Sequence, residues 1–283
     1  MIDFILLQLM RMMPTHLISR WVGNAASRPI SRKAIPFFSK FYQISLEEAE
    51  MALGDYQTLN DFFTRKLKRE ARPIDTDEKF IVSPADGKIA AFGTIERGQL
   101  IQAKGIPFAV WNLLGIPQSE TQRYEGGQFM TIYLSPRDYH RVHTPVSGEI
   151  TDYSYLPGTL FPVNAFGARA VKGLFAKNER LITFVQSPTV GRVAIVKVGA
   201  TIVGSVKVGY SREAGTNVKA GTVLHQRLTA AKPLERGEEI GYFQFGSTVV
   251  LVFEQGKVEF TSSLEEGQAV KMGQTIGRCI TVE

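Results

Sequence analysis

The hydrophobic pattern separates a helical N-terminal part from a β-rich remainder. In the first segment, MIDFILLQLMRMM, a spacing of 100° per residue places Asp3, Gln8 and Arg11 on one narrow arc, with apolar residues elsewhere. This pattern predicts an amphipathic helix with a wide apolar face. It is shorter than the roughly 20 apolar residues of a membrane span, and Pro14 interrupts any extension.

Such a helix is suited to lie in a membrane interface. A helix packed on the protein core fits the same pattern equally well, and a mitochondrial transit segment stays open because of the arginines. Two further helix starts are predicted by capping sequences. Ser45 to Glu48 has the S-x-x-E spacing of a capping box, and Thr58 to Asp61 is a T-x-x-D variant.

From about Ile81 onward the pattern changes to short β-branched runs, such as RVAIVKV and TIVGSVKV, that are separated by glycine. These runs are typical of an antiparallel, turn-rich β structure. The chain is therefore predicted to be an α+β protein. A helical, membrane-associating part is expected to span residues 1–78, and a β-rich domain is expected to span residues 79–283.

The distribution of charge indicates an anionic binding partner for the N-terminal residues. The chain has 283 residues, of which 44% are apolar and 21% charged, as in ordinary globular proteins. Its formal net charge of +6 is concentrated in residues 1–40, which carry six Lys or Arg against Asp3 alone. Such an end could serve nucleic acid, an anionic membrane or an import receptor. Aromatic residues among the basic ones, Trp21 first, favour the membrane surface.

The stretch FQFGSTVVLVFE predicts a buried strand through Val249–Phe253 that is opened by small residues. A bulge or turn alone would explain Gly246 and Ser247 at the start of a strand. A nucleophilic serine is the alternative. A glycine would let the serine oxygen approach the preceding carbonyl within the near-attack distance of about 3 to 3.5 Å.

Two of the four histidines, His140 and His143, fall close together in YLSPRDYHRVHTP. In a strand this spacing puts them on opposite faces, whereas in a turn they could converge. A solvated surface loop and a zinc pair are alternatives. Metal is not expected, because the segment lacks a third histidine and the HExxH pattern.

Asp86 lies in SPADGKI, where turn chemistry alone would explain it. An acid in a fixed turn, a histidine and a serine beside glycine are nevertheless the three parts of a relay that activates a nucleophile. The base takes the hydroxyl proton, and the carboxylate orients the base.

Taken in order along the chain, a set of segments resembles the phosphatidylserine decarboxylase proenzymes of the bacterial type. The segments are FFTRKLKREARPID, PADGKI, QAKG, YLSPRDYHRVHTPVSG, PGTLFPVN, LFAKNER, VGATIVGS, FGST and FEQGKV. The sequence departs from the family pattern at Phe245, where many members have leucine, but Gly246, Ser247 and Thr248 are intact.

The resemblance implies self-cleavage between Gly246 and Ser247 into a large chain (1–246) and a small chain (247–283). Ser247 would be the nucleophile and the precursor of a covalent pyruvoyl group. By position in the family motifs, His143 would be its general base, Asp86 the acid that orients His143, and His140 the group that protonates the substrate. Neither a metal nor PLP is expected.

The implied reaction converts phosphatidylserine to phosphatidylethanolamine and CO2 through an imine. The implied fold is a barrel-sandwich-like β body, so that residues 79–283 would be the catalytic domain. The implied partners are phosphatidylserine, an anionic membrane surface and the two chains of one precursor, without nucleic acid, and a homodimer stays open. The protein would be peripheral on the cytoplasmic face of the bacterial inner membrane.

Two other classes of function compete with this one. A serine hydrolase would use the same residue types, but the sequence lacks a GxSxG elbow, and Ser247 opens a strand instead of a helix. A non-catalytic β module with a membrane-binding tail would make FGST a simple turn. Both alternatives predict an intact chain, whereas a self-cleaving enzyme yields two.

Overall fold

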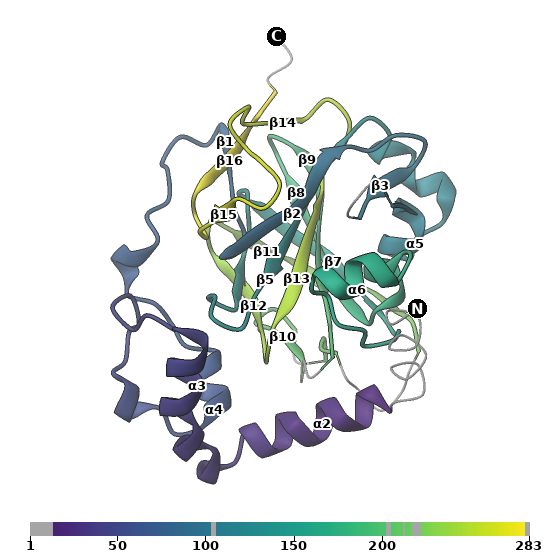
Figure 1. Cartoon of the computed structure of the whole chain (residues 1–283). Coiled ribbons are helices and arrows are strands. Elements are labelled where there is room, and N and C mark those ends of the chain that lie inside the picture. Colours follow the sequence, from purple (N-terminus) through teal and green to yellow (C-terminus); the bar gives the residue numbers. More distant parts are fainter. Residues whose placement is uncertain (1–13, 103–105, 202–204, 212, 217–221, 281–283) are drawn as a thin grey trace.

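A computed structural model describes residues 14–102, 106–201, 205–211, 213–216 and 222–280. The amphipathic helix predicted for residues 1–13 lies outside the described residues. Figure 1 shows helices α2, α3 and α4 at one end of the molecule and the β strands at the other. Among the residues that the structure describes, no helix is long and apolar enough to cross a membrane.

The N-terminal part consists of short helices. They are α2 (Thr15–Ala26), η1 (Pro29–Ala34), α3 (Ile35–Tyr42), η2 (Leu53–Asp55), α4 (Leu59–Phe63) and η3 (Arg69–Ala71). The predicted helix start at Thr58 is confirmed. The Thr58 side chain accepts a hydrogen bond from the Asp61 backbone N–H at 3.0 Å and so caps α4.

The predicted helix start at Ser45 is wrong. The backbone after it pairs with residues 66–68 instead, through bonds from Glu50 N to Lys66 O at 3.0 Å and from Lys68 N to Glu48 O at 2.8 Å. The Glu48 carboxylate, which a capping box would turn back to the helix start, binds Arg72 and Lys271. Long-range pairing therefore overrides the local capping signal.

The α+β class is confirmed, since strands begin at Phe80 and run through the rest of the chain. The largest sheet has the order β11 (Leu224–Leu234), β7 (Gly148–Leu156), β8 (Arg180–Ser187), β9 (Gly191–Val198), β13 (Ser247–Val252), β5 (Gln128–Leu134), β2 (Gly87–Thr94), β15 (Ala269–Val270). The smaller sheets are β10 (Val206–Val208), β12 (Glu239–Phe243), β6 (Arg141–His143); β1 (Phe80–Val82), β16 (Thr275–Cys279), β14 (Val258–Phe260); and β3 (Gln99–Ile101), β4 (Pro107–Ala109).

Every strand pair described in these sheets is antiparallel, as predicted. The large sheet is open, with β11 and β15 at its edges, so among the described strands no sheet closes into a barrel. Short helices that the sequence did not predict lie between the strands of the β-rich part. They are α5 (Val110–Leu114), η4 (Gln118–Tyr124), α6 (Ala165–Ala170) and α7 (Leu174–Lys177).

Strand β13 lies in the middle of the large sheet, between β9 and β5. All its residues are buried, which explains why its sequence is a continuous apolar run and not an alternation. Residues 244–246 carry the chain from β12, in a smaller sheet, into β13. Figure 1 shows that this crossing faces the end of the molecule that carries α2 and α4.

The helical part and the β-rich part meet near this crossing. Phe63 of α4 stacks on Phe245, with ring centroids 4.7 Å apart. Close by, the Arg141 guanidinium donates to the Thr64 carbonyl oxygen at 3.0 Å. Helix α4 is thus held against the residues that precede β13.

Candidate functional site

Ser247 opens β13, as the sequence predicts, and pairs with Leu134 of β5. Its side chain is completely buried, and its hydroxyl has no hydrogen-bond partner among the described residues. Because a buried hydroxyl without a partner costs free energy, such groups in native structures call for an explanation. This position suits a group that is consumed in a reaction.

The backbone just before Ser247 is strained. Phe245 has a φ of 87°, in the left-handed region that bulky side chains avoid. Gly246 follows it in a confined position, since a Cβ added there would lie 3.3 Å from the Leu134 carbonyl oxygen. Strained residues of this kind cluster at functional sites.

Of the two candidate histidines, His140 is the one that lies beside Gly246, just before the Gly246–Ser247 peptide bond. A Cβ added to Gly246 would lie 3.9 Å from His140 Nε2. His140 Nδ1 donates to the Asp138 carbonyl oxygen at 2.8 Å, so Nε2 carries the lone pair, and it has no partner among the described residues. The ring packs on Phe63, with centroids 4.0 Å apart.

The environment keeps His140 neutral. Burial, and to a lesser extent the Arg65 charge, lower the pKa of His140 to about 3. The ordinary pKa of an imidazole, about 6.5, therefore does not apply to this histidine in the folded chain. Here Nε2 is a hydrogen-bond acceptor beside Gly246.

His143 lies at the end of β6 and has both ring nitrogens engaged. Nδ1 donates to the Gly237 carbonyl oxygen at 2.8 Å, and Nε2 accepts from the Tyr139 hydroxyl at 3.1 Å. Burial lowers the pKa of His143, opposed by the Gly237 hydrogen bond and by the charges of Glu239 and Asp86. Burial also raises the pKa of Tyr139, so this phenol keeps its proton.

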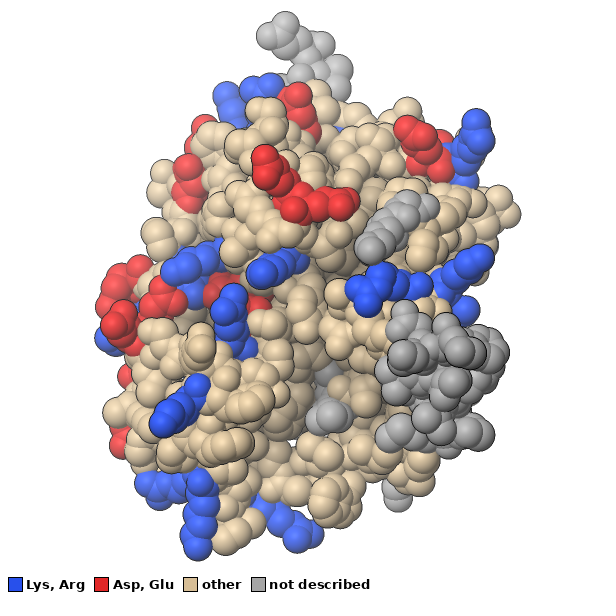
Figure 2. Space-filling view, viewed as in Figure 1, with Lys and Arg blue, Asp and Glu red and all other residues tan. Residues whose placement is uncertain are grey.

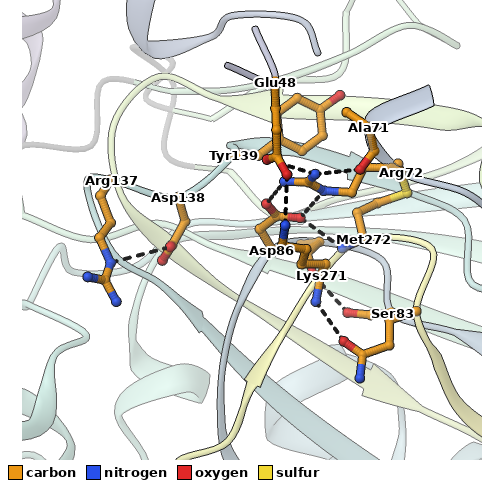
Figure 3. Close-up of polar contacts among 12 residues, drawn as sticks. Glu48, Ala71, Arg72, Ser83, Asp86, Arg137, Asp138, Tyr139, Lys271 and Met272 are labelled. Atoms are coloured by element: carbon orange, nitrogen blue, oxygen red, sulfur yellow. Dashed lines mark hydrogen bonds and ion pairs between the residues drawn. The ribbon is translucent and has the colours of Figure 1, made fainter. Parts of the chain in front are cut away.

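Asp86 binds an arginine and not a histidine. Arg72 Nε donates to Asp86 Oδ1 at 2.9 Å, Arg72 Nη2 donates to Oδ2, and the Met272 backbone N–H donates to Oδ1 at 2.8 Å. Figure 3 shows Tyr139 beside this ion pair. Among the described contacts, the expected hydrogen bond between Asp86 and His143 is absent. Asp86 acts on His143 only through its charge, which raises the pKa of that histidine.

Arg72 extends the network to the N-terminal part. Its Nη1 lies 2.9 Å from Glu48 Oε2, and Glu48 Oε1 lies 2.7 Å from Lys271 Nζ (Figure 3). The roles of Arg72 and Tyr139 were not predicted from the sequence. Their partners are brought near by the fold, and no local spacing marks such a pairing.

A cleft of about 590 Å³ leads to the Gly246 backbone. It runs between α2 and the β-rich part, and its walls are mainly apolar. They include Trp21, Ala26, Phe63, Phe245 and Tyr133. The described residues contain no group of three or more His, Cys, Asp or Glu side chains that could hold a metal ion.

Comparisons with known proteins identify the family of this chain. The family profile described as phosphatidylserine decarboxylase matches residues 59–278. A protein of Brevibacillus brevis named phosphatidylserine decarboxylase proenzyme is 47% identical over 95% of this chain and 95% of its own length. A protein of the same name from Myxococcus xanthus is 41% identical over 97% of this chain and 98% of its own. The chain therefore belongs to the phosphatidylserine decarboxylase family.

Proposed function

We propose that this chain is a precursor that cuts itself between Gly246 and Ser247 and then decarboxylates phosphatidylserine to phosphatidylethanolamine. One observation carries the proposal. The buried Ser247 hydroxyl, without a partner among the described residues, directly follows the strained Phe245 and Gly246, and Gly246 lies beside His140 Nε2, which also lacks a partner among these residues. Family membership supports the same activity.

The self-cleavage step needs only groups of the chain and one water. Ser247 Oγ loses its proton to a base and attacks the Gly246 carbonyl carbon, so that the peptide bond becomes an ester and the Ser247 nitrogen becomes an amine. Removal of the Ser247 α-proton then expels the Gly246 carboxylate. Addition of water and loss of ammonia leave a ketone at residue 247.

We assign the base of this step to His143, with Asp86 assisting through its charge; an orienting hydrogen bond from Asp86 would require a rearrangement, because Asp86 now binds Arg72. Both groups are buried, and the Asp86 charge favours a proton on His143. In this assignment Tyr139, which now occupies His143 Nε2, must release that nitrogen. A competing assignment makes His140 the base, and the closeness of its Nε2 to Gly246 favours it.

The two assignments give opposite results for one variant. If His143 is the base, His143→Ala and Asp86→Asn accumulate the uncut chain, whereas His140→Ala still cleaves and loses decarboxylation. If His140 is the base, His140→Ala stays uncut. The measurement is the fraction of cut chain against time, with the exposed His225→Ala as the control. Thermal unfolding shows whether Asp86→Asn remains folded, because this change also weakens the pair with Arg72.

The site fits a pyruvoyl group derived from Ser247. The group would stand at the first residue of β13, in a buried position next to Gly246, which His140 Nε2 faces. When present, its ketone supplies an electron sink while CO2 leaves the substrate. His140 is the residue that we propose to return a proton to the substrate carbon. This role requires Nε2 to gain a proton that it lacks in the uncleaved chain.

We further propose that the protein works at the cytoplasmic face of the bacterial inner membrane. Trp21, Phe37 and Phe41 are 73%, 73% and 66% exposed on α2 and α3. Between residues 14 and 46 every charged side chain is basic, and Figure 2 shows Lys and Arg around this mostly uncharged end. The apolar cleft leads from the same helices to Gly246, so a lipid headgroup could enter without leaving the interface.

Intact-mass measurement of purified protein tests the proposal. We expect a large chain 1–246 and a small chain 247–283, the small one lighter than a serine-started peptide by one ammonia and reactive toward carbonyl reagents. Ser247→Ala should remain whole, and Ser247→Cys should cut slowly through its thiolate. An active wild-type protein that keeps one chain and an unmodified Ser247 would contradict self-cleavage and favour a hydrolase.

A further inference from the structure

Arg65, just after α4, is a buried cation without a carboxylate partner among the described ion pairs. It is 5% exposed. Its Nη2 donates to the Arg137 carbonyl oxygen at 2.9 Å and to the Asp138 carbonyl oxygen at 3.2 Å. Nε and Nη1 are buried and have no hydrogen-bond partner among the described residues. Three N–H donors of this guanidinium are therefore unused.

A second buried arginine shows what a purely structural role looks like. Arg180 is also 5% exposed, but each of its nitrogens donates to a backbone carbonyl oxygen. Their acceptors are the carbonyls of Leu113, Asn178 and Asn112, at 2.7, 2.8 and 2.5 Å. Since an unpaired buried donor is costly, the open donors of Arg65 indicate a missing anion.

The position of Arg65 connects it to the reaction site. The Asp138 carbonyl oxygen accepts from both Arg65 Nη2 and His140 Nδ1, so the guanidinium and the imidazole lie on either side of one oxygen atom. His140 in turn faces Gly246. The Asp138 carboxylate is directed elsewhere and accepts from the backbone N–H and hydroxyl of Ser135, both at 2.7 Å.

We infer that Arg65 binds the phosphodiester of the lipid headgroup, an inference that rests on the proposed function. In phosphatidylserine the phosphorus is four bonds from the amine nitrogen, so both can lie within one small site. The substrate carboxylate is the poorer candidate. It must lose its charge as CO2 departs, and an arginine that bound it would stabilise the ground state more than the transition state.

The phosphodiester keeps its charge from substrate to product. Binding it is therefore a uniform contribution, which lowers KM and leaves kcat nearly unchanged. A charge-assisted hydrogen bond network of this kind is worth roughly tenfold or more in affinity. Arginine suits the task because it stays charged even when buried.

The test uses the full-length protein and dihexanoyl phosphatidylserine, a short-chain substrate that stays in solution. Arg65→Gln should raise KM about tenfold or more with a smaller change in kcat, and Arg65→Lys should fall in between. With an O-alkyl serine ether, which has the amine and carboxylate but no phosphate, the variants should match wild type. Arg137→Gln is the matched control, because this arginine is exposed and only its backbone carbonyl contacts Arg65.

A second measurement removes turnover. In a Ser247→Ala background, dihexanoyl phosphatidylethanolamine should bind, and Arg65→Gln should weaken that binding by the same factor as it raises KM. Thermal unfolding shows which Arg65 variants remain folded. An unchanged KM and an unchanged affinity in a folded Arg65 variant would overturn the inference. Equal losses with the phosphate-free substrate would overturn it too, because they indicate a structural role. A wild-type protein that decarboxylates neither substrate would instead reject the proposed function.

Discussion

At the scale of single residues, the site combines several local costs around one bond. Phe245 holds a left-handed backbone conformation, and Ser247 Oγ and His140 Nε2 are buried without partners among the described residues. Strained backbone of this kind costs of order 1–3 kcal/mol, and each unpaired polar group adds a cost of similar size. Packing of Phe245 on Phe63 offsets part of it. Cutting the chain after Gly246 would release the turn from this constraint.

The buried imidazole of His140 predicts a pH dependence of stability. Its pKa is about 3 in the folded protein and about 6.5 in an unfolded chain, so between these values the unfolded state binds the additional proton. The contribution of His140 to the free energy of unfolding is therefore complete above pH 6.5. It decreases as the pH is lowered below 6.5, by up to about 1.4 kcal/mol per pH unit.

Denaturant unfolding of the uncleaved Ser247→Ala protein between pH 7 and 5 measures this dependence. His140→Gln in the same background should make the curve less steep, with a remaining slope from His143, whose pKa is also lowered. The exposed His225→Gln controls for the loss of an imidazole. A curve that His140→Gln leaves as steep as before would assign the effect to other groups.

The sequence predicted some of these residues and not others. Ser247 could be placed at the start of a strand because the apolar run after it is unbroken, and His140 and Asp86 were singled out by their residue types. The geometry that joins them could not be predicted. Asp86 was expected to orient His143, but the fold pairs it with Arg72, and nothing in the spacing of these residues distinguishes the two partners.

At the scale of elements, local sequence patterns predicted those helices and strands that long-range pairing does not override. The α+β class and the antiparallel strands followed from the change in hydrophobic period near residue 80. Of two similar capping sequences, the one at Thr58 forms a helix and the one at Ser45 does not. The difference is that residues 48–50 bond to residues 66–68, which no local pattern reveals.

This contrast provides a matched pair of variants. Thr58→Ala removes the cap of α4 and should lower the free energy of unfolding by about 1 kcal/mol. Ser45→Ala should stay within about 0.5 kcal/mol of wild type, because its hydroxyl makes only a 3.4 Å contact with Glu47 N and caps no helix. Equal effects in chemical denaturation would mean that the cap contributes nothing to the stability of α4.

At the scale of the whole molecule, the end formed by α2 and α3 carries exposed aromatic side chains, and Figure 2 shows Lys and Arg side chains at the same end. We expect this end to bind anionic vesicles. Phe41→Glu and Trp21→Glu should each weaken binding about tenfold or more, since each removes roughly 1.5–3 kcal/mol of apolar burial and adds a repelled charge. High salt should release part of the wild-type protein.

Vesicle co-sedimentation measures both effects. The control is Val223→Glu, which places the same charge on an apolar side chain that is 55% exposed on the β-rich part. Equal weakening by Val223→Glu would show that net charge, and not the helical end, determines binding.

The central place of β13 would determine the lifetime of a protein that is cut before Ser247. Its neighbours β5 and β9 both belong to residues 1–246, so after a cut before Ser247 the middle strand of the sheet is a separate polypeptide. Once such a molecule unfolds, its pieces diffuse apart, and reassembly would require two chains to meet at cellular dilution. The lifetime of each cleaved molecule would then depend on its rate of unfolding, and not on an equilibrium between folded and unfolded forms.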